Sequence, residues 1–116
     1  MHLLRILVVL FLVATYAQAQ SPVARSYTEV AETAEWTFYV DTRSIKNDSF
    51  YCQFSMLAQH KLYGTQVPFY VEIQKRQNRY KTRDADKLSF HSLYYVPIPA
   101  GSVLEAAYQF ANESGR

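Results

Sequence analysis

The chain has 116 residues, enough for one ordinary domain, with 12 basic and 10 acidic side chains and a formal net charge of +2. Only three glycines and four prolines are present, which excludes collagen-like and low-complexity sequences. A chain of this size buries one hydrophobic core. The near-neutral charge argues against nucleic-acid binding, which is usually accompanied by a strong basic excess.

The first 19 residues differ from the rest, because 15 of them are apolar and Arg5 carries their one charge. An uninterrupted apolar run spans 6–13, and Ala17-Gln18-Ala19 is a small-x-small cleavage sequence before Gln20. This order predicts a cleaved signal peptide over 1–19, since the run is shorter than the roughly 20 residues that span a bilayer. We expect an exported mature chain, periplasmic or secreted, without a transmembrane segment. No cysteine follows the cleavage sequence, so we expect no lipid anchor.

Cys52 is the single cysteine of the chain, so no internal disulfide is possible. It falls on the apolar side of an alternating run, which predicts a small buried hydrophobic side chain. The alternative interpretation is a bridge between two copies, which would give a homodimer. With no internal disulfide, we expect core packing to hold the domain together.

Residues 20–35 form a polar lead-in that could add a short edge strand. From residue 36 onwards, alternation of apolar and polar side chains with a period of two predicts strands. Three such runs are clear, and their core sides consist of Trp36, Phe38 and Val40, then Phe50, Cys52, Phe54 and Met56, then Val67, Phe69, Val71 and Ile73. Two further extended segments are expected at 79–83 and 88–96, with a polar corner at 84–86 between them.

The C-terminal segment changes to a helical period. Gly101 allows a turn, and Ser102 with Glu105 has the spacing of a capping box, so both residues are given structural roles. The apolar stripe that follows consists of Leu104, Ala107, Tyr108 and Ala111. It predicts a helix over about 103–112 that packs on the sheet. The sequence therefore predicts one α+β domain over 36–116, with a small antiparallel sheet of about five to six strands packed by a C-terminal α-helix.

Catalytic and metal-binding motifs are absent from the sequence. It contains no glycine-rich phosphate loop, no Gly-x-Ser-x-Gly elbow and no His-Glu-x-x-His. His60 and His91 lie 31 residues apart without neighbouring ligands, and Asp84 with Asp86 fits a solvated turn. We therefore expect a protein that is not an enzyme and uses neither a cofactor nor a metal ion.

The segment 75–83 stands out because it contains five cations and no acid in nine residues. If 79–83 is a strand, Arg79, Lys81 and Arg83 share one face and Tyr80 turns inward. Such a stripe suits an acidic glycan, lipopolysaccharide group or protein patch. The alternative is an edge strand whose charges only block edge-to-edge pairing.

Tyrosine is also frequent, with nine in the predicted mature chain. Tyrosine rings give rigid contact area with a polar tip, which suits interfaces. In a strand, the adjacent pair Tyr94-Tyr95 would turn one ring inward and one outward. The candidate binding residues are therefore Lys75, Arg76, Arg79, Lys81, Arg83, Tyr94 and Tyr95.

The order of three segments resembles that of the bacterial surface-adhesin protein E family. The first segment is Trp36-Thr-Phe-Tyr-Val-Asp41-Thr-Arg-Ser-Ile45, and the second is the run from Glu72-Ile73 through Arg79-Tyr80-Lys81. The third is Tyr95-Val-Pro-Ile-Pro-Ala-Gly-Ser102, followed by Glu105-Ala-Ala-Tyr108-Gln-Phe-Ala111. The resemblance covers about 36–112 and gives Trp36 a structural place. It implies an exported protein of a Gram-negative bacterium, with a small antiparallel sheet, a C-terminal helix and binding of host extracellular proteins.

This chain departs from that family pattern at two cysteines. Many members carry one in the central segment and one near the end of the last helix, whereas here the segment around Lys75 has none and Asn112 stands at the second position. The founding adhesin also resembles a lipoprotein, and this chain lacks the required cysteine. Retention on the outer surface is therefore not implied here.

We expect an exported, non-enzymatic binding module that contacts a host extracellular-matrix protein, a glycan or a cell-envelope component. The basic run and the exposed tyrosines would make the contact, and nucleic acid is not an expected partner. The alternative is a periplasmic structural or accessory protein whose surface charges serve only solubility and edge protection.

Overall fold

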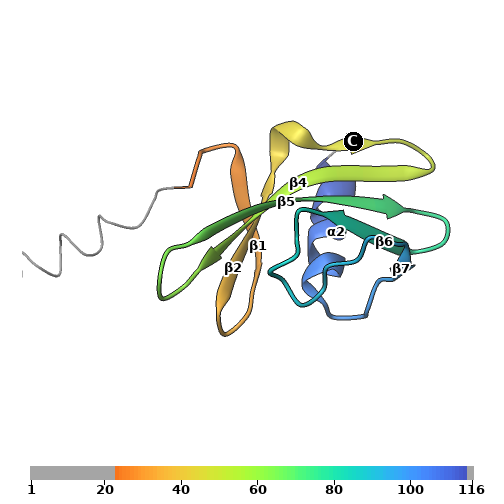
Figure 1. Cartoon of the computed structure of the whole chain (residues 1–116). Coiled ribbons are helices and arrows are strands. Elements are labelled where there is room, and N and C mark those ends of the chain that lie inside the picture. The colour runs from red at the N-terminus through yellow and green to blue at the C-terminus, as the bar shows by residue number, and fades with distance from the viewer. Residues whose placement is uncertain (1–22, 115–116) are drawn as a thin grey trace, which may run out of the picture.

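The structure is a computed structural model that describes residues 23–114. The predicted signal peptide over 1–19 lies outside the described residues. An antiparallel sheet packs one face against a helix, so the expected α+β class is confirmed (Figure 1). The elements are β1 (Tyr27–Glu32), β2 (Trp36–Asp41), a short 3-10 turn η1 (Thr42–Ser44), β3 (Lys46–Asn47), β4 (Tyr51–His60), β5 (Gln66–Gln74), β6 (Arg79–Arg83), β7 (Val96–Pro97) and α2 (Val103–Ser114).

The sheet has seven strands in the order β1-β2-β4-β5-β6-β7, and β3 pairs with the first part of β4. β4 and β5 form its centre, with nine cross-strand residue pairs from Tyr51 opposite Gln74 to Gln59 opposite Gln66. Two of the strands, β3 and β7, are only two residues long. Those short strands account for the excess over the five to six that the alternating runs predict.

The core lies between the sheet and α2. Apolar side chains at alternate positions of the strands all turn to this face, because successive side chains of a strand point to opposite sides. The buried set includes Phe38, Val40, Cys52, Phe54, Met56, Val67, Phe69, Val71 and Ile73 from the sheet and Leu104, Ala107 and Ala111 from the helix. The period of two therefore predicts these core positions correctly.

The helix begins with the expected cap in a slightly altered form. The backbone N–H of Glu105 donates to Ser102 Oγ at 3.2 Å, and the Glu105 carboxylate accepts from the N–H of Gly101 at 3.1 Å. Gly101 has a φ of +74°, a conformation that glycine adopts without strain. The helix extends to Ser114, two residues beyond the predicted end.

The prediction that Phe50 points into the core is wrong. Its side chain is 54% exposed, because β4 begins one residue later and Phe50 belongs to the preceding turn. The Asp48 carboxylate sets that turn by accepting from the backbone N–H groups of Phe50 and Tyr51 at 2.7 and 2.8 Å.

The extended segment predicted at 88–96 is also wrong over most of its length. Within it only Val96 lies in a strand, β7, and the remainder is a loop. Leu88 is buried and Phe90 packs on Phe38 with ring centroids 5.7 Å apart, so single apolar side chains anchor the loop to the core. The Tyr80 hydroxyl also donates to the Phe90 carbonyl at 2.7 Å.

The polar lead-in contains β1, the edge strand that the sequence allows. It pairs with β2 from Tyr27 opposite Asp41 to Glu32 opposite Thr37. Trp36 is the first residue of β2, where its backbone N–H donates to Thr33 Oγ1 at 3.1 Å. Its ring contacts the His60 ring edge-on with the two centroids 5.0 Å apart, consistent with a structural role.

Cys52 is fully buried, as the alternating run predicts. Burial raises the pKa of its thiol to about 11. A bridge between two copies would require this side chain to leave the core.

Candidate binding surface

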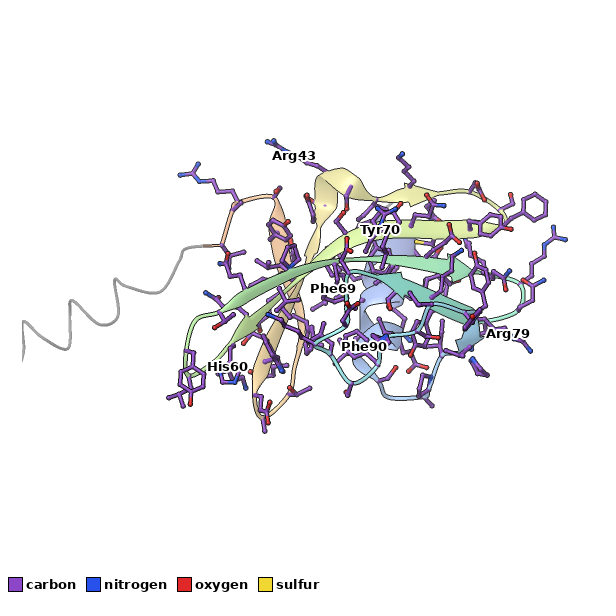
Figure 2. All side chains as sticks on the ribbon, viewed as in Figure 1. Arg43, His60, Phe69, Tyr70, Arg79 and Phe90 are labelled. Atoms are coloured by element: carbon purple, nitrogen blue, oxygen red, sulfur yellow. The ribbon has the colours of Figure 1, made fainter. Side chains whose placement is uncertain are left out.

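The face of the sheet away from α2 carries polar and aromatic side chains, and we call its β4–β5–β6 part the outer face. The strand register places these side chains in three cross-strand rows. The rows are Tyr51, Gln74 and Arg79; Gln53, Glu72 and Lys81; and Ser55, Tyr70 and Arg83. Figure 2 labels Tyr70 near the middle of β5 and Arg79 at the start of β6.

Glu72 is the centre of a hydrogen-bonded network in the middle row. One carboxylate oxygen accepts from Gln53 Nε2 at 2.8 Å, and the other accepts from the Tyr95 hydroxyl and lies 3.4 Å from Lys81 Nζ. The Tyr70 hydroxyl donates to Gln53 Oε1 at 3.1 Å and extends the network to the next row. These contacts fix the side chains in defined positions before any partner arrives.

Two of the β6 cations lie over tyrosine rings. Lys81 Nζ is 4.8 Å from the centroid of the Tyr95 ring, and Arg83 Cζ is 4.8 Å from that of Tyr70. Cation–π contacts of this kind contribute about 0.5–1 kcal/mol at exposed sites. They hold both charges beside tyrosine rings of the outer face.

The positive charge of the β6 row is only partly cancelled by acids. Lys81 shares Glu72, and Arg83 Nε lies 4.0 Å from Asp84 Oδ2 in an ion pair exposed on both sides. Arg79 forms no ion pair with any residue from 23 to 114. Three cations therefore lie beside two carboxylates, and the row keeps a surplus of one positive charge. Successive cations lie about 6.7 Å apart along the strand.

The edge of β6 is covered by other parts of the chain. β7 pairs with Arg79 and Tyr80, and the N–H of Thr82 donates to the Ser92 carbonyl at 2.7 Å. Basic side chains are a common way to protect an open edge from pairing with another chain. Here that role is largely taken by backbone contacts, so the charge row needs a different explanation.

Of the other four predicted binding residues, three lie apart from this row and Tyr95 contacts it. Lys75 Nζ donates to Asn47 Oδ1 at 2.8 Å and to the Asp48 carbonyl at 2.9 Å. Arg76 lies over the Phe50 ring at 4.5 Å. Tyr94 is exposed in the loop before β7, whereas Tyr95 joins the Glu72 network. Of the seven candidates, the structure therefore brings together Arg79, Lys81, Arg83 and Tyr95.

Gln53, Tyr70 and Glu72 belong to the surface and were not among the predicted binding residues. The alternating pattern places them on the polar side of their strands. Their grouping with the β6 cations depends on strand register, which the hydrophobic pattern and the turn geometry set together. A small hollow of about 250 Å³ adjoins the third row, and its lining includes Tyr27, Asp41, Tyr70 and Arg83.

A larger groove lies where the β1–β2 turn, the loop at 87–90 and the start of α2 meet. It has a volume of about 700 Å³, and its apolar lining includes Trp36, Phe38, Phe90 and Leu104. No residue of the outer-face rows lines it. It is therefore a feature separate from the charge row.

Residues 23–114 contain no cluster of three or more His, Cys, Asp or Glu side chains that could hold a metal ion. No helix in the same range is long and apolar enough to cross a membrane. His60 has a local role, since its Nδ1 accepts from the N–H groups of Leu62 and Tyr63 at 3.2 Å.

Comparison of the chain with family models, curated proteins and solved structures gives no match. Arguments about function therefore start from the outer face and its charges. The resemblance in segment order adds an expectation about where the protein acts.

Proposed function

We propose that this protein is an exported, non-enzymatic binding module that holds an acidic macromolecule against its outer face. The observation that carries the proposal is the row of Arg79, Lys81 and Arg83 on a strand whose edge is already covered. Because edge protection does not account for these three charges, a partner of opposite charge is the best explanation.

The network around Glu72 supports this function by preorganising the surface. Lys81 is held between the Glu72 carboxylate and the Tyr95 ring, and Arg83 is held over Tyr70. A partner therefore meets side chains that have already lost part of their rotational freedom, which lowers the entropic cost of binding. The regular spacing of the row suits a chain-like partner with repeated acidic groups.

The partner class follows from the expected location. The predicted N-terminal export signal and the segment order that resembles the surface-adhesin protein E family both favour a partner outside the cytoplasm. An acidic glycan of the host matrix or of the cell envelope, or an acidic patch on a matrix protein, has the required charge.

The test compares binding of the purified mature protein to immobilised heparin and to an unsulfated neutral polysaccharide. We expect the protein to bind heparin and not the neutral polysaccharide. Its affinity for heparin should fall steeply between about 50 and about 200 mM salt, a range over which electrostatic binding to a polyanion weakens strongly. The variant Arg79→Ala/Lys81→Ala/Arg83→Ala should bind about tenfold more weakly or worse, since each exposed charge pair contributes up to about 1 kcal/mol.

The matched control is Arg25→Ala/Arg43→Ala/Lys87→Ala, which removes the same charge from exposed positions away from β6. This control should keep most of the affinity. Equal losses in both triple variants would show that only net charge matters. Binding that neither variant weakens would remove the outer face from consideration and favour the periplasmic structural or accessory role.

A further inference from the structure

One end of the sheet presents an exposed aromatic side chain with a cation over its ring and further basic residues in the same two turns and in β3. It is formed by the β3–β4 turn and the β5–β6 turn, which lie side by side because the N–H of Lys75 donates to the Phe50 carbonyl at 2.9 Å. We call the residues Lys46, Asp48, Phe50, Tyr51, Lys75 and Arg76 the basic tip. Phe50 is 54% exposed and Tyr51 is 41% exposed.

The exposure of Phe50 is imposed by its backbone. Its N–H donates to the Asp48 carboxylate at 2.7 Å, and its carbonyl accepts from Lys75. Hydrogen bonds on both sides of the residue fix the backbone of the turn at Phe50. The guanidinium of Arg76 lies 4.5 Å from the ring centroid, so a cation accompanies the exposed ring.

The basic tip has more positive than negative charge. Lys75 Nζ donates to two neutral oxygens, on Asn47 and on the backbone of Asp48, and Lys46 and Arg76 form no ion pair with any described residue. Asp48 is the acid of the tip, and the N–H groups of Tyr51 and Phe50 lower the pKa of its carboxyl. The six residues of the basic tip therefore include three cations and one carboxylate.

The β4–β5 turn lies at the opposite end of the sheet (Figure 1), and this end differs from the basic tip in charge. Leu62 and Tyr63 in the β4–β5 turn are 59% and 75% exposed, so this end is at least as apolar as the basic tip. Its neighbouring cation, Lys61, is paired with Glu32 at 3.0 Å. Apolar exposure occurs at both ends, whereas the cation surplus distinguishes the basic tip.

We propose that the basic tip docks on the surface of a membrane that contains anionic phospholipid. Aromatic rings settle at the headgroup level of a bilayer, and basic side chains beside them are attracted to anionic lipids. Phe50 and Tyr51 would enter this interface while Lys46, Lys75 and Arg76 meet the headgroup phosphates. This partner goes beyond the proposed function, which uses the β6 row, and of the residues of the basic tip only Tyr51 also belongs to the outer-face rows.

The test is co-sedimentation of the purified mature protein with two kinds of vesicle, phosphatidylcholine alone and phosphatidylcholine with one third phosphatidylglycerol (a composition of roughly biological charge density). We expect binding to the anionic vesicles and weakening by salt. Phe50→Ala should weaken vesicle binding about tenfold through lost apolar burial, and Arg76→Gln should weaken it about fivefold through lost charge.

The matched control is Leu62→Ala/Tyr63→Ala, which removes more exposed apolar surface from the opposite end. It should bind anionic vesicles as the parent does. Thermal unfolding of each variant verifies the fold, and heparin binding of Phe50→Ala should be unchanged. Equal sedimentation with both kinds of vesicle, no loss for Phe50→Ala, or an equal loss in the control would each overturn the proposal.

Discussion

Glu72→Gln separates the two roles of the carboxylate at the centre of the outer face. The charged group accepts hydrogen bonds from Gln53 and Tyr95 and pairs with Lys81, and its side chain is only 20% exposed. Glutamine has nearly the same shape but no charge, and one of its two terminal atoms is a donor. The change therefore weakens the network and removes a negative charge beside the β6 row.

Both effects can be estimated from the structure. A hydrogen bond to a charged group contributes about 1.5–3 kcal/mol, and glutamine keeps one acceptor atom, so we expect a loss of about 2 kcal/mol of unfolding free energy. In a domain of this size that lowers the melting temperature by roughly 8–16 °C. Removing one charge about 7 Å from an anionic partner in water contributes about 0.6 kcal/mol, or roughly threefold tighter binding.

The assay is thermal unfolding by circular dichroism together with heparin affinity for the parent and the variant. Glu29→Gln is the control, because Glu29 is exposed on β1 and forms no ion pair with a described residue. It should unfold at the parent temperature. If Glu72→Gln also unfolds at that temperature, the network does not stabilise the sheet. If its heparin affinity falls, the loss of the preorganised network costs more binding than the removed charge adds, and the expectation of tighter binding is refuted.

Two further predictions concern the core and the helix. Because the pKa of the buried Cys52 thiol is about 11 in the folded state and near 9.0 when exposed, the unfolded chain loses this proton first as pH rises. The unfolding free energy should fall by about 2 kcal/mol between pH 9 and 11. The measurement is urea unfolding at several pH values followed by Trp36 fluorescence, in which Cys52→Ala should lack the decrease in unfolding free energy that the thiol causes. If the unfolding free energies of the parent and of Cys52→Ala fall equally with pH, the thiol is not the titrating group. Ser102→Ala removes the acceptor for the Glu105 N–H and should lower stability by about 1 kcal/mol, whereas Ser102→Asp should retain the cap; equal melting temperatures for these two variants would argue against it.

The local pattern of the sequence predicts much of the fold. Alternation identifies the buried sides of β4 and β5, and the spacing of Ser102 and Glu105 marks the start of α2. The same pattern fails at 88–96. Leu88 and Phe90 are two residues apart, as in a strand, but they lie in a loop that each of them anchors separately to the core. Hydrogen-bond partners decide between these two conformations, and no run of apolar residues identifies those partners.

The candidate site divides in the same way. Alternation along one strand was enough to place Arg79, Lys81 and Arg83 on one face, since this follows from the geometry of an extended backbone. Only the tertiary structure could place Glu72 and Gln53 beside Lys81. It also shows that the Tyr95 hydroxyl donates to Glu72 and that Lys75 Nζ donates to Asn47 Oδ1. Cross-strand neighbours are set by register, and register depends on how the whole core packs against α2. The sequence by itself determined which side chains share a strand face, and the packed sheet decided which of them meet.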